Sequence, residues 1–350
     1  MATSTATQTT QRHTERVVPF QAGDGMPLNL IHIQGSKPPT LMPVLLVHGA
    51  GVRANLFRAP VARTIVDELI DRGYDVWMEN WRASIDLKPS SWTLDQAAAF
   101  DHPRAVETIV RETGCSEMKA IIHCQGSTSF MMSAVAGLVP QVTTILTNAV
   151  SLHPVVTDLS YWKIKLTVPL IKPFTQYLDA QWGLEKPTTV AKILDVVVQV
   201  THNECDNAVC KWSSFTYGSG HPTLWSHENL DSTTHEWIKQ EFAKVPLTFF
   251  EQMNACLKQG HLVAREKRPG LPMDFVAETP KTKARVAFFA GEDNICFLPE
   301  SQRQTFEYFD RIRPDYHSLT IIPRYGHLDM FIGKNAARDV FPAMLAELEK

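Results

Sequence analysis

The sequence has little of several features that define common classes of protein. Its 350 residues include six cysteines, far below the density of a disulfide-stabilised scaffold. Its 34 basic and 37 acidic side chains give a formal charge of −3, so no extended basic field is available to bind nucleic acid. No apolar run approaches the roughly 18 residues of a membrane-spanning helix. The sequence contains neither a dinucleotide-binding glycine motif nor a phosphate-binding loop with lysine, so we expect no cofactor.

The N-terminal segment M-A-T-S-T-A-T-Q-T-T-Q-R-H is polar and lacks the apolar region of a secretory signal. We therefore predict that residues 1–15 form a disordered tail, that the thiols are reduced and that the protein is cytoplasmic.

The rest of the chain has an ordinary globular composition, 44% hydrophobic and 20% charged. Alternating apolar segments around A-G-D-G predict a β-hairpin between Val17 and Gln34. From Pro43 to residue 150, strands alternate with helices expected over 55–72, 95–113 and through Met132. The alternation resumes at A-R-V-A-F-F-A-G and ends with a helix from about Asn335. This order predicts an α/β protein with a mostly parallel sheet covered by helices on both faces.

The strand–helix regularity lapses over residues 152–280, a segment rich in Trp, His and Pro. Helices are expected there near 161–180, 189–201 and 235–259. We predict one core formed by 16–151 and 281–350, into which 152–280 is inserted as a helical cap.

The strongest local motif is I-I-H-C-Q-G-S at 121–127, a buried strand that runs into a helix through a tight turn. Such a turn lifts one side chain above the sheet edge beside backbone N–H groups, as a nucleophile elbow requires. Cys124 lies at its tip. Gly126 matches the second glycine of G-x-S-x-G, whereas Ile122 replaces the first. The alternative is that Cys124 is a small buried side chain at a strand end.

Two distant turns favour the catalytic interpretation. V-H-G-A-G at 47–51 ends a central strand with N–H groups that can bind an oxyanion, and R-Y-G-H-L-D-M-F at 324–331 places His327 after the last strand. Together these turns resemble the α/β-hydrolase superfamily over about 17–150 and 281–350. More narrowly, W-R-A-S-I-D, H-C-Q-G-S and Y-G-H-L-D look like hydrolase-type segments associated with sterol-oxidase-like flavoproteins.

The resemblance implies an eight-stranded sheet, a nucleophile after strand five, an acid after strand seven and a histidine after strand eight. These positions match Cys124, the G-E-D-N turn at 291–294 and His327. By the family's G-x-x-D register the acid position falls on Asn294, whereas the carboxylate is Asp293. Both remain open as the third triad member, with a slight preference for Asp293 because a carboxylate stabilises imidazolium. Asp329 is interpreted as a helix-start residue, and Glu79 and Asp86 are weaker candidates.

A cysteine nucleophile at a helix N-terminus beside a histidine is expected to have a lowered pKa and to be a thiolate at neutral pH. Backbone N–H groups of Gln125 and of Ala50 or Gly51 would form the oxyanion hole, with His327 as general base and acid. The predicted function is an ester or thioester hydrolase or an acyltransferase. Its substrate is expected to be a small apolar acyl compound, and a homodimer is left open. The alternatives are a cofactor-free lyase or cyclase without a covalent intermediate, and an inactive ligand-binding protein.

The insertion contains H-N-E-C-D-N-A-V-C at 202–210, which brings together His202, Cys205 and Cys210, with His221, His227 and His235 downstream. Zinc sites use such side chains, but the spacing has no second close pair. We therefore expect no metal here and favour a reduced structural cysteine pair, with a regulatory disulfide as the further alternative.

Overall fold

The computed structural model describes residues 13–220 and 222–350. Its centre is an eight-stranded sheet in the order β1-β2-β4-β3-β5-β6-β9-β10. The strands are β1 (Thr14–Gln21), β2 (Pro27–Gln34), β3 (Pro43–Val47), β4 (Asp75–Asn80), β5 (Met118–His123), β6 (Val142–Asn148), β9 (Arg285–Gly291) and β10 (Ser318–Ile322). β1 and β2 pair antiparallel, as does β2 with β4, and the other neighbours are parallel. The predicted mostly parallel sheet and its N-terminal hairpin are confirmed.

The hairpin begins earlier than the sequence suggests. The predicted tail includes Thr14 and Glu15, but these are the first residues of β1, where they pair with Gln34 and Ile33. The backbone hydrogen bonds offered by β2 extend the strand to this point. Residues 1–12 of the predicted tail lie outside the described residues.

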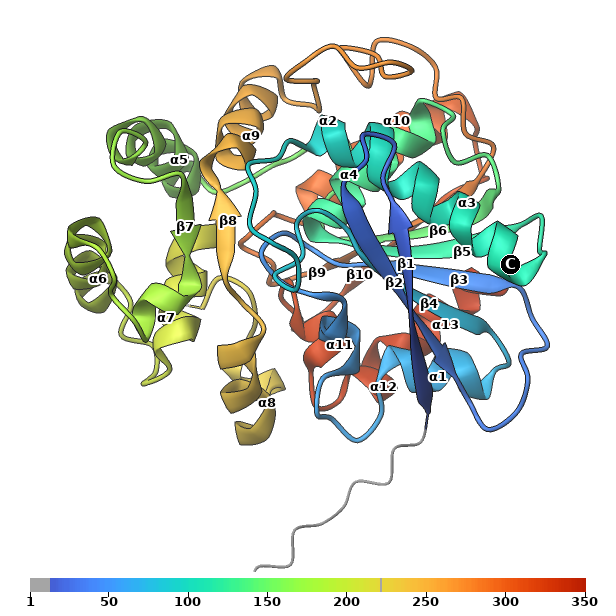
Figure 1. Ribbon diagram of the computed structural model, residues 1–350, viewed down its shortest axis with the longest axis horizontal. Helices are drawn as coiled ribbons and strands as arrows, with labels where there is room; N and C mark the ends of the chain where they lie inside the picture. Colours follow the sequence, from blue (N-terminus) through green and yellow to red (C-terminus); the bar gives the residue numbers. More distant parts are fainter. Residues whose placement is uncertain (1–12, 221) are drawn as a thin grey trace, which may run out of the picture.

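Helices cover both faces of the sheet (Figure 1). One layer contains α1 (Ile65–Asp71), α12 (Ala336–Asp339) and α13 (Phe341–Leu348), and the other contains α3 (His102–Thr113), α4 (Cys124–Val135) and α10 (Glu300–Ile312). Every residue of β3, β4 and β5 is buried, which explains the continuous apolar run of β3. The remaining short elements of the core are η1 (Ala54–Arg58), α2 (Leu94–Gln96), η2 (Ala97–Asp101) and α11 (Asp329–Ile332).

The single helix predicted over 55–72 is wrong, because the chain forms η1 and then α1. Ala59 is extended, as expected of a residue before proline, and Pro60 has no N–H to donate. Thr64 then starts α1 through a capping box with Asp67. By contrast, the helix predicted over 95–113 is present as α2, the π-helical η2 and α3 in direct succession.

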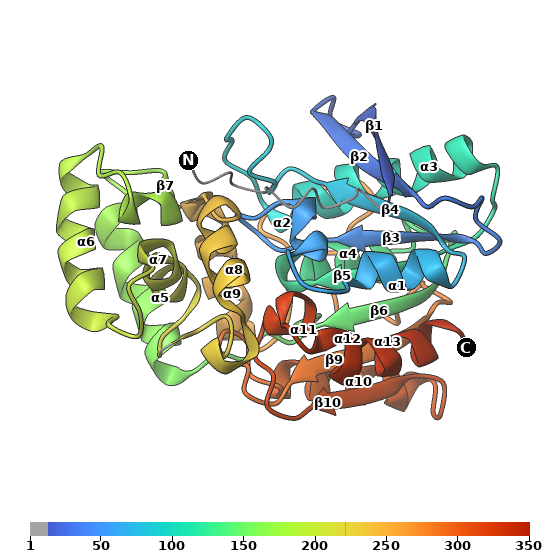
Figure 2. The same cartoon turned by 90° about the horizontal axis from the view of Figure 1, so that it is seen from below.

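Most of the inserted segment is helical and lies beside the sheet (Figure 2). Its α6 (Thr189–Thr201) agrees with the prediction, whereas the helix expected over 161–180 stops at Ile171, and the one over 235–259 is interrupted at β8. The remaining elements are α5 (Asp158–Ile171), β7 (Tyr177–Asp179), η3 (Ala180–Gly183), α7 (Ala208–Tyr217), η4 (His227–Asn229), α8 (Ser232–Trp237), η5 (Ile238–Gln240), β8 (Lys244–Pro246) and α9 (Leu247–Gln259). β7 and β8 pair antiparallel, a long-range contact that local periodicity does not reveal.

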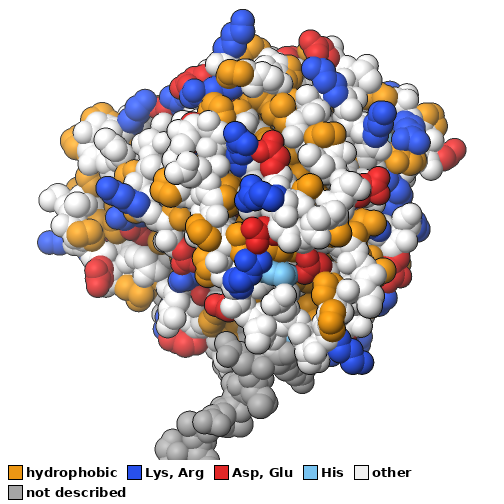
Figure 3. All heavy atoms as spheres, turned by 45° about the vertical axis from the view of Figure 1, so that its right-hand side comes forward, with side chains coloured by type: hydrophobic (Ala, Val, Ile, Leu, Met, Phe, Trp, Pro, Cys, Tyr) orange, Lys and Arg blue, Asp and Glu red, His pale blue; other side chains and the backbone are white. Residues whose placement is uncertain are grey.

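Within the described residues, no helix has the length and apolar character needed to cross a bilayer. The face shown in Figure 3 carries basic and acidic side chains interspersed with one another, and no extended patch of one sign covers it. That distribution agrees with the near-neutral charge of the sequence.

Candidate active site

Cys124 lies at a strained turn between β5 and α4. Its φ of 57° is in the left-handed region, which non-glycine residues seldom occupy. A side chain on Gly126 would place a Cβ 2.2 Å from the carbonyl oxygen of His48, and one on Gly49 would lie 2.9 Å from the Cβ of Cys124. The two glycines therefore let the turn approach the end of β3. This geometry has the form of a nucleophile elbow.

Two backbone N–H groups reach the sulfur of Cys124, those of Gln125 and Ala50. Gly51, the alternative donor considered from the sequence, instead donates its N–H to the carbonyl oxygen of Ala83 at 3.2 Å. The two converging N–H groups are therefore those of Gln125 and Ala50, one from each turn.

His327 follows β10 and lies over Cys124. The Cys124 sulfur and one ring nitrogen each from His123 and His327 all lie within 4.8 Å of one another. The rings of His123 and His327 have centroids 4.7 Å apart. Neither nitrogen of His327 has a hydrogen-bond partner among the described residues, and burial lowers the pKa of this imidazole to about 3. The histidine is consequently neutral in the closed site.

The two candidates for the third triad member face in opposite directions. The Asp293 side chain is exposed, and its backbone N–H donates to the carbonyl oxygen of Tyr325. Asn294 is buried, and its Oδ1 accepts the N–H groups of Cys296 and Phe297, both at 3.1 Å. Its Nδ2 has no partner among the described residues. The group of this buried amide that has no partner is therefore the donor Nδ2, whereas its acceptor Oδ1 is occupied by two backbone N–H groups.

The turn that holds Asn294 packs closely on the loop that holds His327. A Cβ on Gly291 would lie 2.2 Å from the carbonyl oxygens of both Tyr325 and Gly326. Only glycine allows this approach, so residue 291 fixes the distance between the ends of β9 and β10.

Three other carboxylates are engaged elsewhere. Asp329 starts α11, as predicted, and accepts the N–H of Gly326 at 2.8 Å. Glu79 binds Nδ1 of His102 at 2.9 Å, and Asp86 binds Arg53 at 2.8 Å. Among the described residues, no carboxylate makes a hydrogen bond to His327.

The expected thiolate is not what the closed site favours. Burial raises the pKa of the Cys124 thiol to about 12, although the N–H groups of Gln125 and Ala50 act in the opposite direction. Desolvation outweighs two neutral donors because the neighbouring His327 carries no positive charge. The resting pair is therefore a neutral thiol and a neutral imidazole.

The cavity at Cys124 is almost closed. Its volume is about 10 Å³, barely the space of one water molecule. Side chains that the sequence did not single out form much of its wall: His123, Tyr217, Leu224 and Phe242. Tyr217 also donates its hydroxyl to the carbonyl oxygen of Ala50 at 2.7 Å. No local pattern marked Tyr217, because α7 was not predicted.

A larger groove of about 950 Å³ lies outside this cavity, between the inserted segment and the core. Phe242 is part of the wall of both the open groove and the Cys124 cavity.

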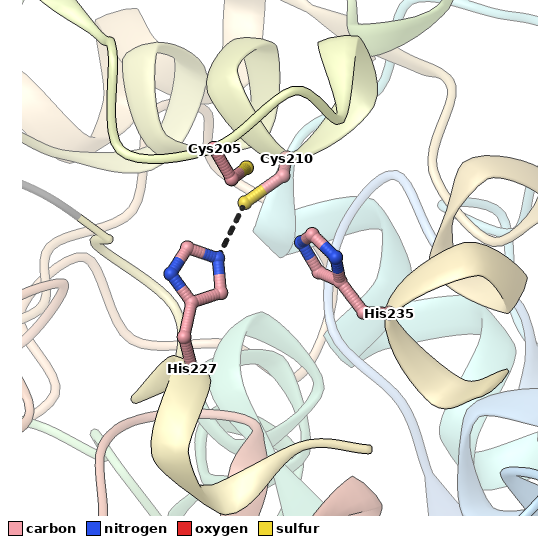
Figure 4. Close-up of side chains that lie close together, drawn as sticks. All are labelled: Cys205, Cys210, His227 and His235. Atoms are coloured by element: carbon pink, nitrogen blue, oxygen red, sulfur yellow. Dashed lines mark hydrogen bonds between the residues drawn. The ribbon is translucent and has the colours of Figure 1, made fainter. Parts of the chain in front are cut away.

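A second cluster of reactive side chains lies in the inserted segment. The ligand atoms of Cys205, Cys210, His227 and His235 all lie within 4.8 Å of one another. Figure 4 shows the two cysteines and the two rings pointing toward a common centre. His202 is not part of this group of four, and His221 lies outside the described residues.

No protein-family model matches the chain. The human protein Lipase member K is 22% identical over 307 residues, covering 81% of this chain and 73% of the human protein. A probable lipase of Schizosaccharomyces pombe is 23% identical over 310 residues, covering 82% of this chain and 65% of that protein. Sterol esterase 2 of Saccharomyces cerevisiae is 23% identical over a shorter stretch, 33% of this chain and 25% of that protein.

Solved structures agree on the fold. An esterase from Thermogutta terrifontis superposes with a TM-score of 0.56 at 13% identity, covering 95% of this chain and 98% of its own. An epoxide hydrolase from Vigna radiata gives 0.55 at 14% identity, covering 97% and 98%. The chain has the α/β-hydrolase fold. Lipases and esterases are thus found both among the sequence relatives and among the structural neighbours of this chain.

Proposed function

We propose that the protein is an esterase or thioesterase, or an acyltransferase, that forms a covalent acyl-enzyme on Cys124. One observation carries this proposal. The Cys124 sulfur, held at a left-handed strand–helix turn, lies beside His327 and within reach of two converging backbone N–H groups.

The acylation step follows from this arrangement. The Cys124 sulfur attacks the carbonyl carbon of the substrate while His327 removes the thiol proton. The carbonyl oxygen becomes an oxyanion, which the N–H groups of Gln125 and Ala50 stabilise. When the tetrahedral intermediate collapses, His327 returns the proton to the leaving alcohol or thiol. Water, or another acyl acceptor, then attacks the thioester by the reverse sequence.

The pKa values of the pair determine how the thiol is activated. With the pKa of Cys124 raised to about 12 and that of His327 lowered to about 3, a preformed ion pair is unfavourable in the closed site. Proton transfer therefore accompanies attack, as in a serine hydrolase. The developing imidazolium needs an orienting acceptor or dipole on its other nitrogen.

We assign that orienting role to Asn294, whose Oδ1 would exchange one of its two backbone N–H donors for the ring N–H of His327, and keep Asp293 as the alternative. Asn294 is buried on the side of its turn that faces the interior, and the turn contacts the His327 loop through Gly291. Asp293 is exposed and would have to rotate inward. A Cys-His-Asn arrangement suits thiol chemistry, because the imidazole needs orientation more than a counter-charge.

An apolar acyl substrate fits the inserted segment, which we propose acts as a cap. The wall of the Cys124 cavity is mainly apolar, with Val52, Leu224 and Phe242 among its residues. Helix α5 also exposes a row of large apolar side chains at helical spacing, namely Leu159, Trp162, Leu166 and Leu170. Exposed apolar faces of this kind mark surfaces that bind apolar ligands or partners, and this one lies outside the lining of the Cys124 cavity and of the outer groove. The cytoplasmic location predicted from the sequence stays part of this proposal.

The test is intact-protein mass spectrometry after brief incubation with p-nitrophenyl esters and acyl thioesters of increasing chain length. Wild type should gain one acyl group that maps to Cys124 and release p-nitrophenol. Cys124→Ala should lose both signals, and His327→Ala should slow acylation by a factor on the order of 100 or more.

The matched control is Cys115→Ala, which removes a more accessible thiol remote from the turn and should acylate as wild type does. Turnover that persists in Cys124→Ala without an adduct would instead favour the lyase or cyclase alternative. Binding of acyl compounds with neither adduct nor turnover would favour an inactive ligand-binding protein. Either result would overturn the covalent mechanism.

A further inference from the structure

We propose that Cys205, Cys210, His227 and His235 bind one structural Zn²⁺ ion, which fastens the inserted helical segment to the loop that carries His327. The proposal is independent of the chemistry at Cys124. None of the four residues lines the cavity beside Cys124.

The four side chains already approximate the geometry of a tetrahedral site. Their ligand atoms lie within 4.8 Å of one another, and the Cys210 sulfur is 3.4 Å from Nε2 of His227. Tetrahedral zinc with Zn–S of ~2.3 Å and Zn–N of ~2.0 Å separates a sulfur from a nitrogen by roughly 3.5 Å. The rings of His227 and His235 are nearly perpendicular, at 83°, so both can direct a nitrogen to one centre (Figure 4).

The donor set favours zinc and a structural role. Two thiols and two imidazoles form the S₂N₂ combination that selects zinc among the common divalent metals. Four protein ligands complete a tetrahedron and leave no open position for water or substrate. The environment also suits a bound ion, because Cys210 is fully buried and Nε2 of His235 is buried without a partner among the described residues.

The backbone around the cluster is preorganised by two polar side chains. Asn207 caps α7 by accepting the N–H groups of Val209 and Cys210 at 3.1 Å, and its amide donates to the carbonyl oxygen of His235 at 2.5 Å. Asp231 caps α8, which carries His235, by accepting the N–H of Thr234 at 2.7 Å. The start of α7 and helix α8 are therefore connected independently of the ion, as expected for a supported metal site.

The expectation of no metal in this segment depended on sequence spacing alone. Cys205 and Cys210 are separated by four residues, and His227 and His235 by seven. The histidine pair comes from η4 and α8, two short helices that pack beside α7 only in the folded chain. The second ligand pair that the spacing lacked is thus supplied by tertiary structure.

Hydrogen bonds connect the segment that carries His227 directly to the loop that carries His327. Asp329 accepts the N–H of Gly326 at 2.8 Å, the N–H of Ser226 at 3.2 Å and the side-chain amide of Asn229 at 2.7 Å. The N–H of Leu328 also donates to the carbonyl oxygen of Leu224 at 2.7 Å. An ion that joins His227 to α7 and α8 would therefore hold the inserted segment against this loop.

The decisive measurement is the metal content of the full-length protein, purified without an affinity tag from zinc-supplemented medium and measured by inductively coupled plasma mass spectrometry. We expect about one zinc per chain. Cys210→Ser and His235→Asn should each reduce the retained zinc about tenfold or more. Chelation should lower the thermal midpoint of wild type, and added Zn²⁺ should restore it.

The matched controls are Cys115→Ser and His261→Asn, which change the same residue types outside the cluster and should retain the full zinc content. If Cys210→Ser fails to fold, cobalt substitution of wild type gives a second readout, since Co²⁺ bound to thiolate has a charge-transfer absorption. Wild type with no stoichiometric zinc and no such absorption would overturn the proposal. A Cys205–Cys210 disulfide in the freshly purified protein, or unchanged zinc in both cluster variants, would overturn it as well.

Discussion

At the scale of single residues, the turn at Cys124 depends on two glycines, because a side chain at either position would clash with neighbouring atoms. Gly49 and Gly126 allow Cys124 to approach the end of β3, and Ile122 replaces the usual first glycine of the motif. Ile122 lies within β5, is fully buried and pairs with Val47 and Thr147. The left-handed turn therefore forms with a large apolar residue two positions before the nucleophile.

The orienting role of Asn294 gives a residue-scale prediction. Asn294→Ala should lower kcat on the order of 100-fold with little change in KM, because His327 loses its orientation while substrate contacts remain. The variant also loses the acceptor for two N–H groups, which should cost about 1–2 kcal/mol of stability. Steady-state kinetics and urea unfolding measure the two effects separately.

Asp293→Ala is the matched control for this prediction, since it alters the neighbouring exposed side chain. We expect it to retain activity, and Asn294→Asp to restore much of the loss because it keeps the acceptor oxygen. A large loss of kcat in Asp293→Ala, with Asn294→Ala unaffected, would return the triad assignment to Asp293.

At the scale of elements, the inserted segment supplies part of the wall around Cys124. Residues of α7 and of the stretch between η5 and β8 form part of the cavity wall, and Phe242 also lines the outer groove. The Phe242 ring contacts Trp225 and Tyr217, with centroids 5.8 and 6.2 Å away. Phe242 is therefore part of a small aromatic cluster.

Phe242→Ala should connect the groove to Cys124. We expect kcat/KM to rise for long-chain p-nitrophenyl esters relative to short ones, because a ring that lines both spaces is removed. Loss of a buried phenyl ring should also cost about 3–5 kcal/mol of stability. Kinetics across a chain-length series, below the unfolding transition of the variant, measure the change in preference.

Phe249→Ala is the comparison variant, because Phe249 is equally buried and packs on Trp92 and Phe250, away from the cavity. It should lose similar stability without altering the chain-length preference. An identical shift in both variants would show that loosening of the structure, and not the removed ring, causes the effect.

At the scale of the whole molecule, several histidines are buried in neutral form near the site. Burial lowers the pKa of His48 and His327 to about 3, and that of His123 well below its usual value. In the unfolded chain these imidazoles titrate near ~6.5. Below that pH the unfolded state binds more protons than the folded state, so the protein loses stability as the pH falls.

The free energy of unfolding should therefore be greatest above about pH 7 and decrease toward pH 5. Each fully buried histidine contributes a slope approaching ~1.4 kcal/mol per pH unit below its unfolded pKa. Urea unfolding at a series of pH values checks this. His261→Asn, at a part-exposed position, should leave the slope unchanged, and a flat profile in wild type would contradict the prediction.

Local sequence patterns were sufficient to predict the order of strands and helices along the chain and the turns that hold Cys124 and His327. Runs such as P-V-L-L-V are buried on both faces of a central strand, and the strand–helix alternation leaves few topologies. Cys124 and His327 were found because each follows a strand in a short turn, and parallel strands bring such turns to one edge. The helix predicted over 55–72 failed because a proline and a capping box outweighed its apolar spacing.

Short-range patterns along the chain were enough to predict the α/β order, the strand–helix turn at Cys124 and the histidine after the last strand, because each depends on neighbours within a few residues. Folding, in contrast, determines that Asn294 is buried while Asp293 is exposed. It also raised the pKa of the Cys124 thiol and gathered His227 and His235 around Cys205 and Cys210. The burial of a side chain and its proximity to other side chains depend on segments that are distant in the sequence. Local periodicity and residue spacing therefore do not predict them.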